Sequence, residues 1–180
     1  MNKLKKVLAI ICLILAFLIV YILQANFFSW FTIAGVKPNL FIIFILLIGL
    51  FAGRKIGVVF GIILGICLDL LIGRTIGISA ILLGAVGFLG EHFDKNFSKE
   101  SRFTIMLMVM GSTFLYEVAG YIYHIFRLGI QFEPYSFIKI ALIEVLYNAI
   151  IVIIVYPIIQ KAGYAIENTF KVKNILTRYF

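Results

Sequence analysis

The sequence predicts an all-α integral membrane protein, a single polytopic bundle of about six membrane-spanning helices. Of its 180 residues, 63% are hydrophobic and only 13% are charged, and the mean hydropathy is +1.13. A soluble domain keeps about a quarter of its residues charged, so this chain has too little polar surface to cover a globule in water. The predicted spans are residues 7–23, 39–53, 56–72, 76–90, 103–126 and 138–160.

Two of these spans are short for a bilayer. A helix rises about 1.5 Å per residue and needs roughly 20 residues to cross the hydrocarbon core. The stretches 39–53 and 76–90 therefore have to include flanking residues, lie where the bilayer is thinner, or be partly re-entrant. Six spans is the prediction, and five is the alternative.

The basic residues predict that both chain ends are cytoplasmic. With the amino terminus inside, twelve of the 16 Lys and Arg residues fall on the inner side, and the others are Lys37, Arg74, Arg127 and Lys139. This asymmetry follows the positive-inside rule and requires an even number of spans. The net charge of +8 is thus mainly a topology signal. Nucleic-acid binding is not expected, because no basic face with interleaved aromatic residues lies outside the membrane segments.

The carboxyl-terminal stretch 161–180 is predicted to be a separate cytoplasmic tail after a bundle formed by residues 1–160. Val172, Ile175, Leu176 and Tyr179 have helical spacing, with basic residues on the other faces. Such a basic amphipathic helix would lie on the anionic inner leaflet of the membrane lipid. A docking site for a cytoplasmic partner is the alternative.

Small residues recur at every fourth position through the third predicted span. The series comprises Gly57, Gly61, Gly65, Asp69, Gly73 and Gly77. Residues four apart share one helix face, and missing side chains let another helix approach until the backbones touch. The facing surface could be the next span, where Ala80, Gly84 and Gly87 are also small. The alternative is that part of the series contacts a helix of another protein.

Polar side chains of several spans are expected at one depth, in the outer half of the membrane. Glu117, Tyr121 and His124 share one helix face, and Glu144 and Asn148 share another. Asp69, with Arg74 five residues later, lies near the same level. We therefore expect a polar cluster or cavity opening outward, made of Asp69, Arg74, Glu117, Tyr121, His124, Glu144 and Asn148. Asp69 could cap or pair at a helix end, or fix a contact with a partner. The cluster could be structural or could bind a ligand.

The sequence does not predict an enzyme. It contains no HExxH motif and no Ser or Cys nucleophile placed near one of its two histidines. An intramembrane aspartyl peptidase needs two aspartates in one site, whereas Asp69 and Asp94 are expected on opposite sides of the membrane. No cofactor and no metal site are expected.

The first half of the chain resembles the bacterial rod shape-determining protein MreD family. The stretch Lys37-Pro38-Asn39-Leu40 resembles the family's entry to its second span, in which Pro38 and Asn39 occupy the motif positions. A following G-x-x-x-G-x-x-x-D-x-x-x-G pattern is matched by Gly61, Gly65, Asp69 and Gly73, with Gly77 continuing it. By these motifs the resemblance covers about residues 36–92, and it lends no support to Glu117 or Glu144.

The resemblance implies a non-enzymatic subunit of the cell-elongation complex in the bacterial cytoplasmic membrane. Such a subunit would bind the single-span protein MreC directly and help to organise peptidoglycan synthesis. MreB, RodA and a class B penicillin-binding protein would belong to the same complex. The family also resembles the substrate-binding S components of energy-coupling-factor vitamin transporters, which are six-span bundles with an outward pocket. Small-molecule uptake as an S component is therefore the alternative function.

Overall fold

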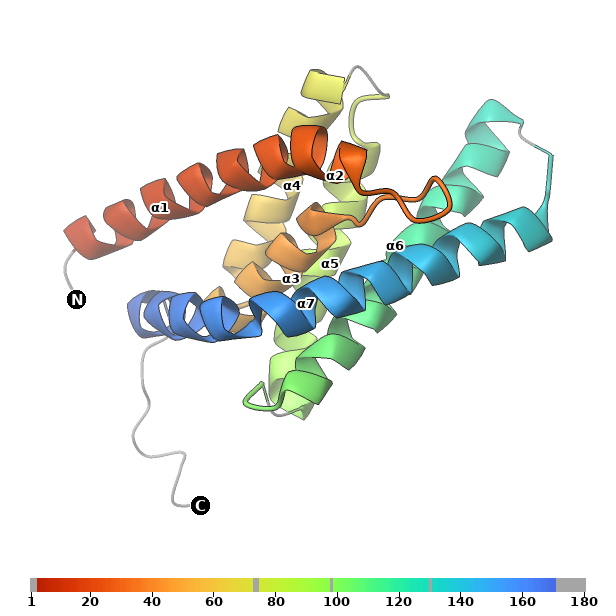
Figure 1. Cartoon of the computed structure of the whole chain (residues 1–180). Helices are drawn as coiled ribbons and strands as arrows, with labels where there is room; N and C mark the ends of the chain where they lie inside the picture. Colours follow the sequence, from red (N-terminus) through yellow and green to blue (C-terminus); the bar gives the residue numbers. More distant parts are fainter. Residues whose placement is uncertain (1–2, 73–74, 98, 130, 171–180) are drawn as a thin grey trace.

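The computed structural model describes residues 3–72, 75–97, 99–129 and 131–170, and nearly all of their regular secondary structure is helical (Figure 1). The helices are α1 (Lys3–Ile22), the π-helical segment η1 (Leu23–Phe27), α2 (Phe28–Trp30), α3 (Leu40–Ala52), α4 (Arg54–Ile72), α5 (Ile78–Asn96), α6 (Arg102–Leu128) and α7 (Pro134–Phe170). Gly73, Arg74 and the predicted amphipathic residues 172–179 lie outside the described residues. The all-α bundle that the composition predicts is confirmed.

Four segments of the described chain are long and apolar enough to cross a membrane. They are Leu4–Trp30, Arg54–Ile72, Arg102–Arg127 and Pro134–Phe170. Helix α3 is apolar but has only 13 residues, and α5 ends in the polar sequence GEHFDKN. Helix α7 continues unbroken to Phe170, so residues 161–170 extend the last predicted span as helix.

Helix α3 occupies the centre of the bundle. Eleven of its residues are buried, including Ile42, Ile45 and Leu50, which are at most 1% exposed. Figure 1 shows α4 and α5 behind α3 and α7 crossing in front of it, and α3 packs on both sides against these helices. A helix that is apolar around its whole circumference is typically buried, and α3 fits this pattern because its neighbours leave it no broad lipid-facing side.

Helix α1 is the most peripheral of the long helices. Its most apolar window is only 11% buried, and it packs mainly through Leu13 and Phe17. The Phe17 ring lies 5.8 Å from that of Phe41 in α3, centroid to centroid. The start of α1 and the end of α7 lie on the same side of the molecule (Figure 1), as an even number of crossings requires.

An ionic cluster closes the end of the bundle that is predicted to be cytoplasmic. Lys99, between α5 and α6, donates to Asp94 of α5 at 2.8 Å and to Glu167 of α7 at 2.6 Å. Burial lowers the pKa of Lys99, but the hydrogen bonds and charges of Asp94 and Glu167 outweigh that effect and raise the pKa above its usual value. The ammonium group also lies 5.5 Å from the centre of the Phe51 ring. The cluster thus joins α3, α5 and α7 at this end.

Candidate functional site: a glycine-packed helix hairpin and an outer polar pocket

The glycine series of α4 lies directly against the backbone of α5. A Cβ built on Gly65 would lie 2.5 Å from both the Cα and the N of Ala80. A Cβ on Gly61 would meet the carbonyl of Leu83, and one on Gly57 would lie 2.8 Å from the carbonyl oxygen of Gly87. Real Cβ atoms do not approach backbone this closely, so these positions accept only glycine at the present helix separation. Gly57, Gly61 and Gly65 therefore pack within the chain, whereas Gly77 lies in the turn before α5 with φ of +107°, and a Cβ there would meet nothing within 4 Å.

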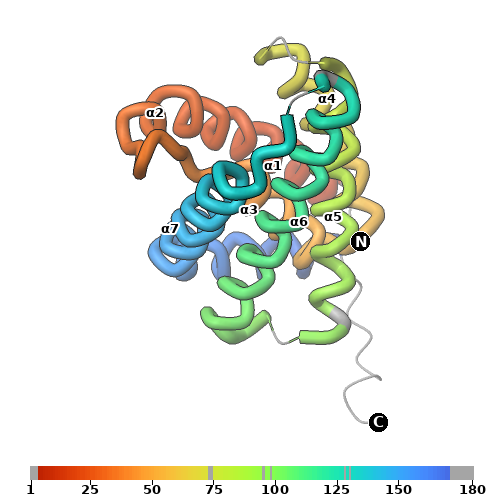
Figure 2. Tube along the Cα trace, turned by 90° about the vertical axis from the view of Figure 1, so that its right-hand side faces the viewer, coloured from red at the N-terminus to blue at the C-terminus, as the bar shows by residue number. Residues whose placement is uncertain are grey.

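Helix α3 joins the same contact through glycines outside that series. A Cβ on Gly57 would lie 2.5 Å from the Cα of Gly49 in α3. On the other side, a Cβ on Gly90 of α5 would lie 2.5 Å from the carbonyl oxygen of Leu46. Figure 2 shows α4 and α5 running side by side, and α3 packs against both. The three helices thus form a unit held by backbone-to-backbone packing, in which dispersion contacts replace side-chain interdigitation.

Two carboxylates cap the α4–α5 hairpin reciprocally. Asp69 near the end of α4 is 1% exposed, and its Oδ2 accepts the backbone N–H groups of Gly77 at 2.7 Å and Ser79 at 3.2 Å. These amides belong to the first turn of α5, where N–H groups lack helical partners. At the opposite end, Glu91 of α5 accepts the N–H of Arg54, the first residue of α4. Each helix therefore supplies a carboxylate to the amino-terminal end of the other, where the helix dipole favours negative charge.

The Pro38–Asn39 motif forms the entry to α3 and is held by two amide side chains. Gln24 donates to the carbonyl of Pro38 at 2.7 Å and accepts the N–H of Leu40 at 3.0 Å. Asn148 of α7, which is fully buried, accepts the N–H of Asn39 at 2.8 Å. Two amides at the start of α3, those of Asn39 and Leu40, are thereby satisfied by side chains from α7 and η1.

We expect Asn148→Leu to destabilise the folded protein by about 1–3 kcal/mol, because the partly buried Asn39 N–H loses its acceptor. The same change leaves the Thr113 hydroxyl without the amide donor it now has at 3.0 Å. Thermal unfolding of the protein in lipid nanodiscs measures the effect. Asn26→Leu is the control, because Asn26 is exposed and donates only to Ile22 within its own helical turn. Equal melting of the two variants would contradict the role given to Asn148.

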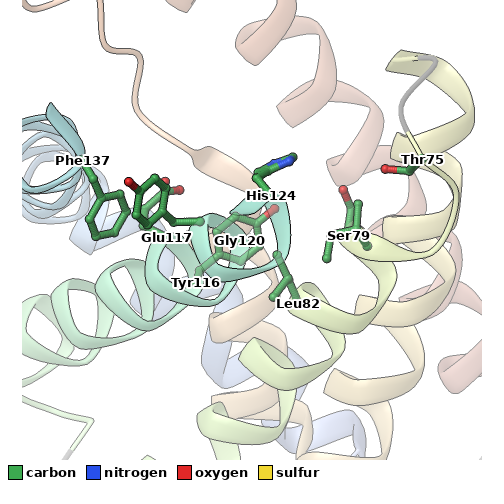
Figure 3. Close-up of a pocket in the computed structure, with 10 residues that line it drawn as sticks. Thr75, Ser79, Leu82, Tyr116, Glu117, Gly120, His124 and Phe137 are labelled. Carbon is green, nitrogen blue, oxygen red and sulfur yellow. The ribbon is translucent and has the colours of Figure 1, made fainter. Parts of the chain in front are cut away.

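A pocket of about 550 Å³ lies between the predicted outer ends of α5 and α6 (Figure 3). Glu117, Tyr121 and His124 of α6 face it together with Ser79 of α5. Phe137 of α7 stacks on Tyr121 with ring centroids 4.2 Å apart and closes one side. The Nδ1 atom of His124 is buried and has no hydrogen-bond partner among the described residues.

A second pocket, of about 510 Å³, adjoins the first. The two share Ser79, Tyr116 and Glu117 in their walls. The second pocket extends past the Pro38–Asn39 entry to Glu144, which is 8% exposed and lies beside Glu117 and Asn39.

The structure brings most of the predicted polar residues to this region. Glu117, Tyr121, His124 and Glu144 line the pockets, Asn148 bonds to Asn39 in the wall, and Asp69 bonds to the backbone of Ser79. Sequence reasoning missed Gln24, Tyr116 and Ser79, which carry no motif and are brought in only by helix packing. It also missed Gly49, Gly90 and Glu91. The described residues contain no group of three or more His, Cys, Asp or Glu that could hold a metal ion.

The apolar helices and glycine-packed hairpin define a helical integral membrane protein. The family model of rod shape-determining protein MreD matches residues 4–162. This chain belongs to the MreD family and is a rod shape-determining protein of the bacterial inner membrane. Comparison with curated proteins and with solved structures gives no match.

Proposed function

We propose that this protein binds MreC directly and acts within the cell-elongation complex that organises peptidoglycan synthesis. The observation that carries the proposal is the family match, which extends over residues 4–162 and so includes all but the end of the helical bundle. MreB, RodA and a class B penicillin-binding protein would be members of the same complex. The proposed role is contact between membrane helices and includes no catalytic step.

The outer face of α4 is the surface we assign to MreC. Val59, Ile63, Ile66 and Leu70 follow one another at helical spacing and are 38–62% exposed. They lie on the side of α4 roughly opposite its glycines, which are covered by α5. A single apolar helix of a partner would pack against this strip without disturbing the hairpin.

Tryptophan substitutions on α4 test this assignment. We expect Ile63→Trp and Ile66→Trp each to lower the amount of MreC that copurifies from membranes by about tenfold, which corresponds to about 1.4 kcal/mol. Both side chains point away from the hairpin, so the variants should keep the thermal stability of the parent protein. Leu115→Trp on α6 is the matched control, because Leu115 is exposed to a similar extent, 52%.

Three outcomes are informative. Loss of MreC from the α4 variants alone supports the assigned face. Undiminished MreC with both α4 variants overturns it, and failure of MreC to copurify with the unsubstituted protein overturns direct binding itself. Nothing in the family match favours the alternative function, a vitamin-transporter S component.

A further inference from the structure

The two pockets at the predicted outer ends of α5 and α6 form one joined site of ligand size. They share Ser79, Tyr116 and Glu117, and their volumes are about 550 and 510 Å³. Pockets that bind small molecules typically measure a few hundred to about a thousand cubic ångströms. The site combines aromatic and apolar side chains with polar ones, among them Asn39, Glu117 and Glu144.

The unpaired polar atoms of the second pocket are hydrogen-bond acceptors. Glu144 is 8% exposed, and its Oε1 has no hydrogen-bond partner among the described residues. The Oδ1 of Asn39 is likewise buried and unpaired. An amide oxygen and an ionised carboxylate oxygen can only accept, so a donor completes this site when Glu144 is ionised.

The charge of the site also favours a cation. Glu144 lies beside a second carboxyl, that of Glu117. Two carboxyl groups in a desolvated site repel each other unless a proton or a cation lies with them. Lys37 also lines the second pocket, but its side chain is exposed and its Nζ donates to Ser29 at 3.1 Å.

Aromatic side chains line the same joined pocket as the two carboxyl groups. Tyr116 contributes to both pockets, Tyr21 and Phe41 line the second, and Tyr121 lines the first. Faces of Tyr and Phe attract cations through their ring quadrupoles, and this attraction strengthens where water is excluded. The aromatic walls therefore suit the same kind of ligand as the carboxyl pair.

We propose that the joined pocket binds a primary ammonium group, with Glu144 and Asn39 accepting its N–H donors and Glu117 contributing the second carboxyl. Three N–H donors on one small cation match acceptors at the entry to α3, in α6 and in α7. The ammonium belongs either to a lipid headgroup, as in phosphatidylethanolamine, or to a free small amine. The MreC face proposed above uses other residues of α4, so each proposal can fail without the other.

The test uses the full chain in nanodiscs made of phosphatidylglycerol with equal fractions of phosphatidylethanolamine and phosphatidylcholine. Native mass spectrometry measures which lipid remains bound after release. We expect phosphatidylethanolamine to be retained at least about tenfold over phosphatidylcholine, whose quaternary ammonium has no N–H donor. Glu144→Gln keeps the shape of the side chain and should abolish this preference. Glu117→Gln is the second variant, and Glu133→Gln, at an exposed residue outside both pockets, is the control.

Adding free ethanolamine distinguishes the two sources of the ammonium. Competition by millimolar ethanolamine assigns the site to small amines, and retention of phosphatidylethanolamine despite ethanolamine assigns it to the lipid. Equal retention of the two lipids with no ethanolamine binding overturns the proposal and leaves a carboxyl pair that shares a proton. A preference that survives in both folded glutamine variants also overturns it.

Discussion

Replacing Gly65 with alanine is expected to destabilise the folded protein by about 3 kcal/mol, the upper end for overpacking a tight core. The added methyl would lie 2.5 Å from the Cα and N of Ala80. These are backbone atoms of a packed helix and cannot rotate aside, so α4 and α5 would have to separate. Separation would in turn weaken the contacts of Gly61 and Gly57 along the same face. Thermal unfolding in nanodiscs of constant lipid composition measures the loss.

Gly111→Ala provides the matched control for this prediction. Gly111 lies inside α6, and a Cβ there would meet nothing within 4 Å. Alanine is favoured over glycine in a helix interior by about 1 kcal/mol, so this variant should melt at the same or a higher temperature. If Gly65→Ala and Gly111→Ala unfold at the same temperature, close helix approach does not stabilise the hairpin.

Replacing Asp69 with alanine is expected to cost about 2–4 kcal/mol, because two partly buried N–H groups lose their carboxylate acceptor. The Gly77 and Ser79 amides should then exchange hydrogen faster, as the first turn of α5 opens more often. Asp69→Asn keeps one carbonyl acceptor but no charge, and should lie between the alanine variant and the parent protein. Hydrogen–deuterium exchange and thermal unfolding together measure both effects.

Glu91→Ala is the control variant that shows whether the faster hydrogen exchange is confined to the turn that Asp69 caps. Because Glu91 accepts the Arg54 N–H at the other end of the hairpin, its loss should raise exchange at the start of α4 and leave Gly77 and Ser79 protected. An Asp69→Ala variant with unchanged exchange at Gly77 and Ser79 would contradict the capping role.

The period of four in the glycines predicted a close helix contact because a single helix face can be identified from sequence spacing. The same spacing named α5 as one candidate partner through Ala80 and Gly87, and the structure places Gly65 and Gly57 against these residues. It could not reveal that Gly49 of α3 packs there too. A periodic pattern describes one helix and carries no information about a third helix that reaches the same groove.

For the polar residues too, the sequence predicted the helix face and the depth in the membrane but not the atomic contacts. Helical spacing placed Glu117, Tyr121 and His124 on one face, and topology gave them a common depth with Glu144. Which polar atoms touch depends on helix crossing and on the turn before α3, so the contact of Glu144 with Asn39 and the role of Gln24 could not be predicted. Asp69 was open to several interpretations until the position of the Gly77 and Ser79 amides was known.

The shortness of α3 has a consequence for biogenesis. Thirteen residues of helix extend about 20 Å, well under the roughly 30 Å of the hydrocarbon core. As an isolated segment leaving the translocon, α3 would be mismatched to the bilayer. Its glycine contacts with α4 and α5 and its buried surface exist only when those helices are beside it. We therefore expect α3 to integrate stably only together with the α4–α5 hairpin, so that membrane insertion of residues 40–96 is a cooperative step rather than three sequential ones.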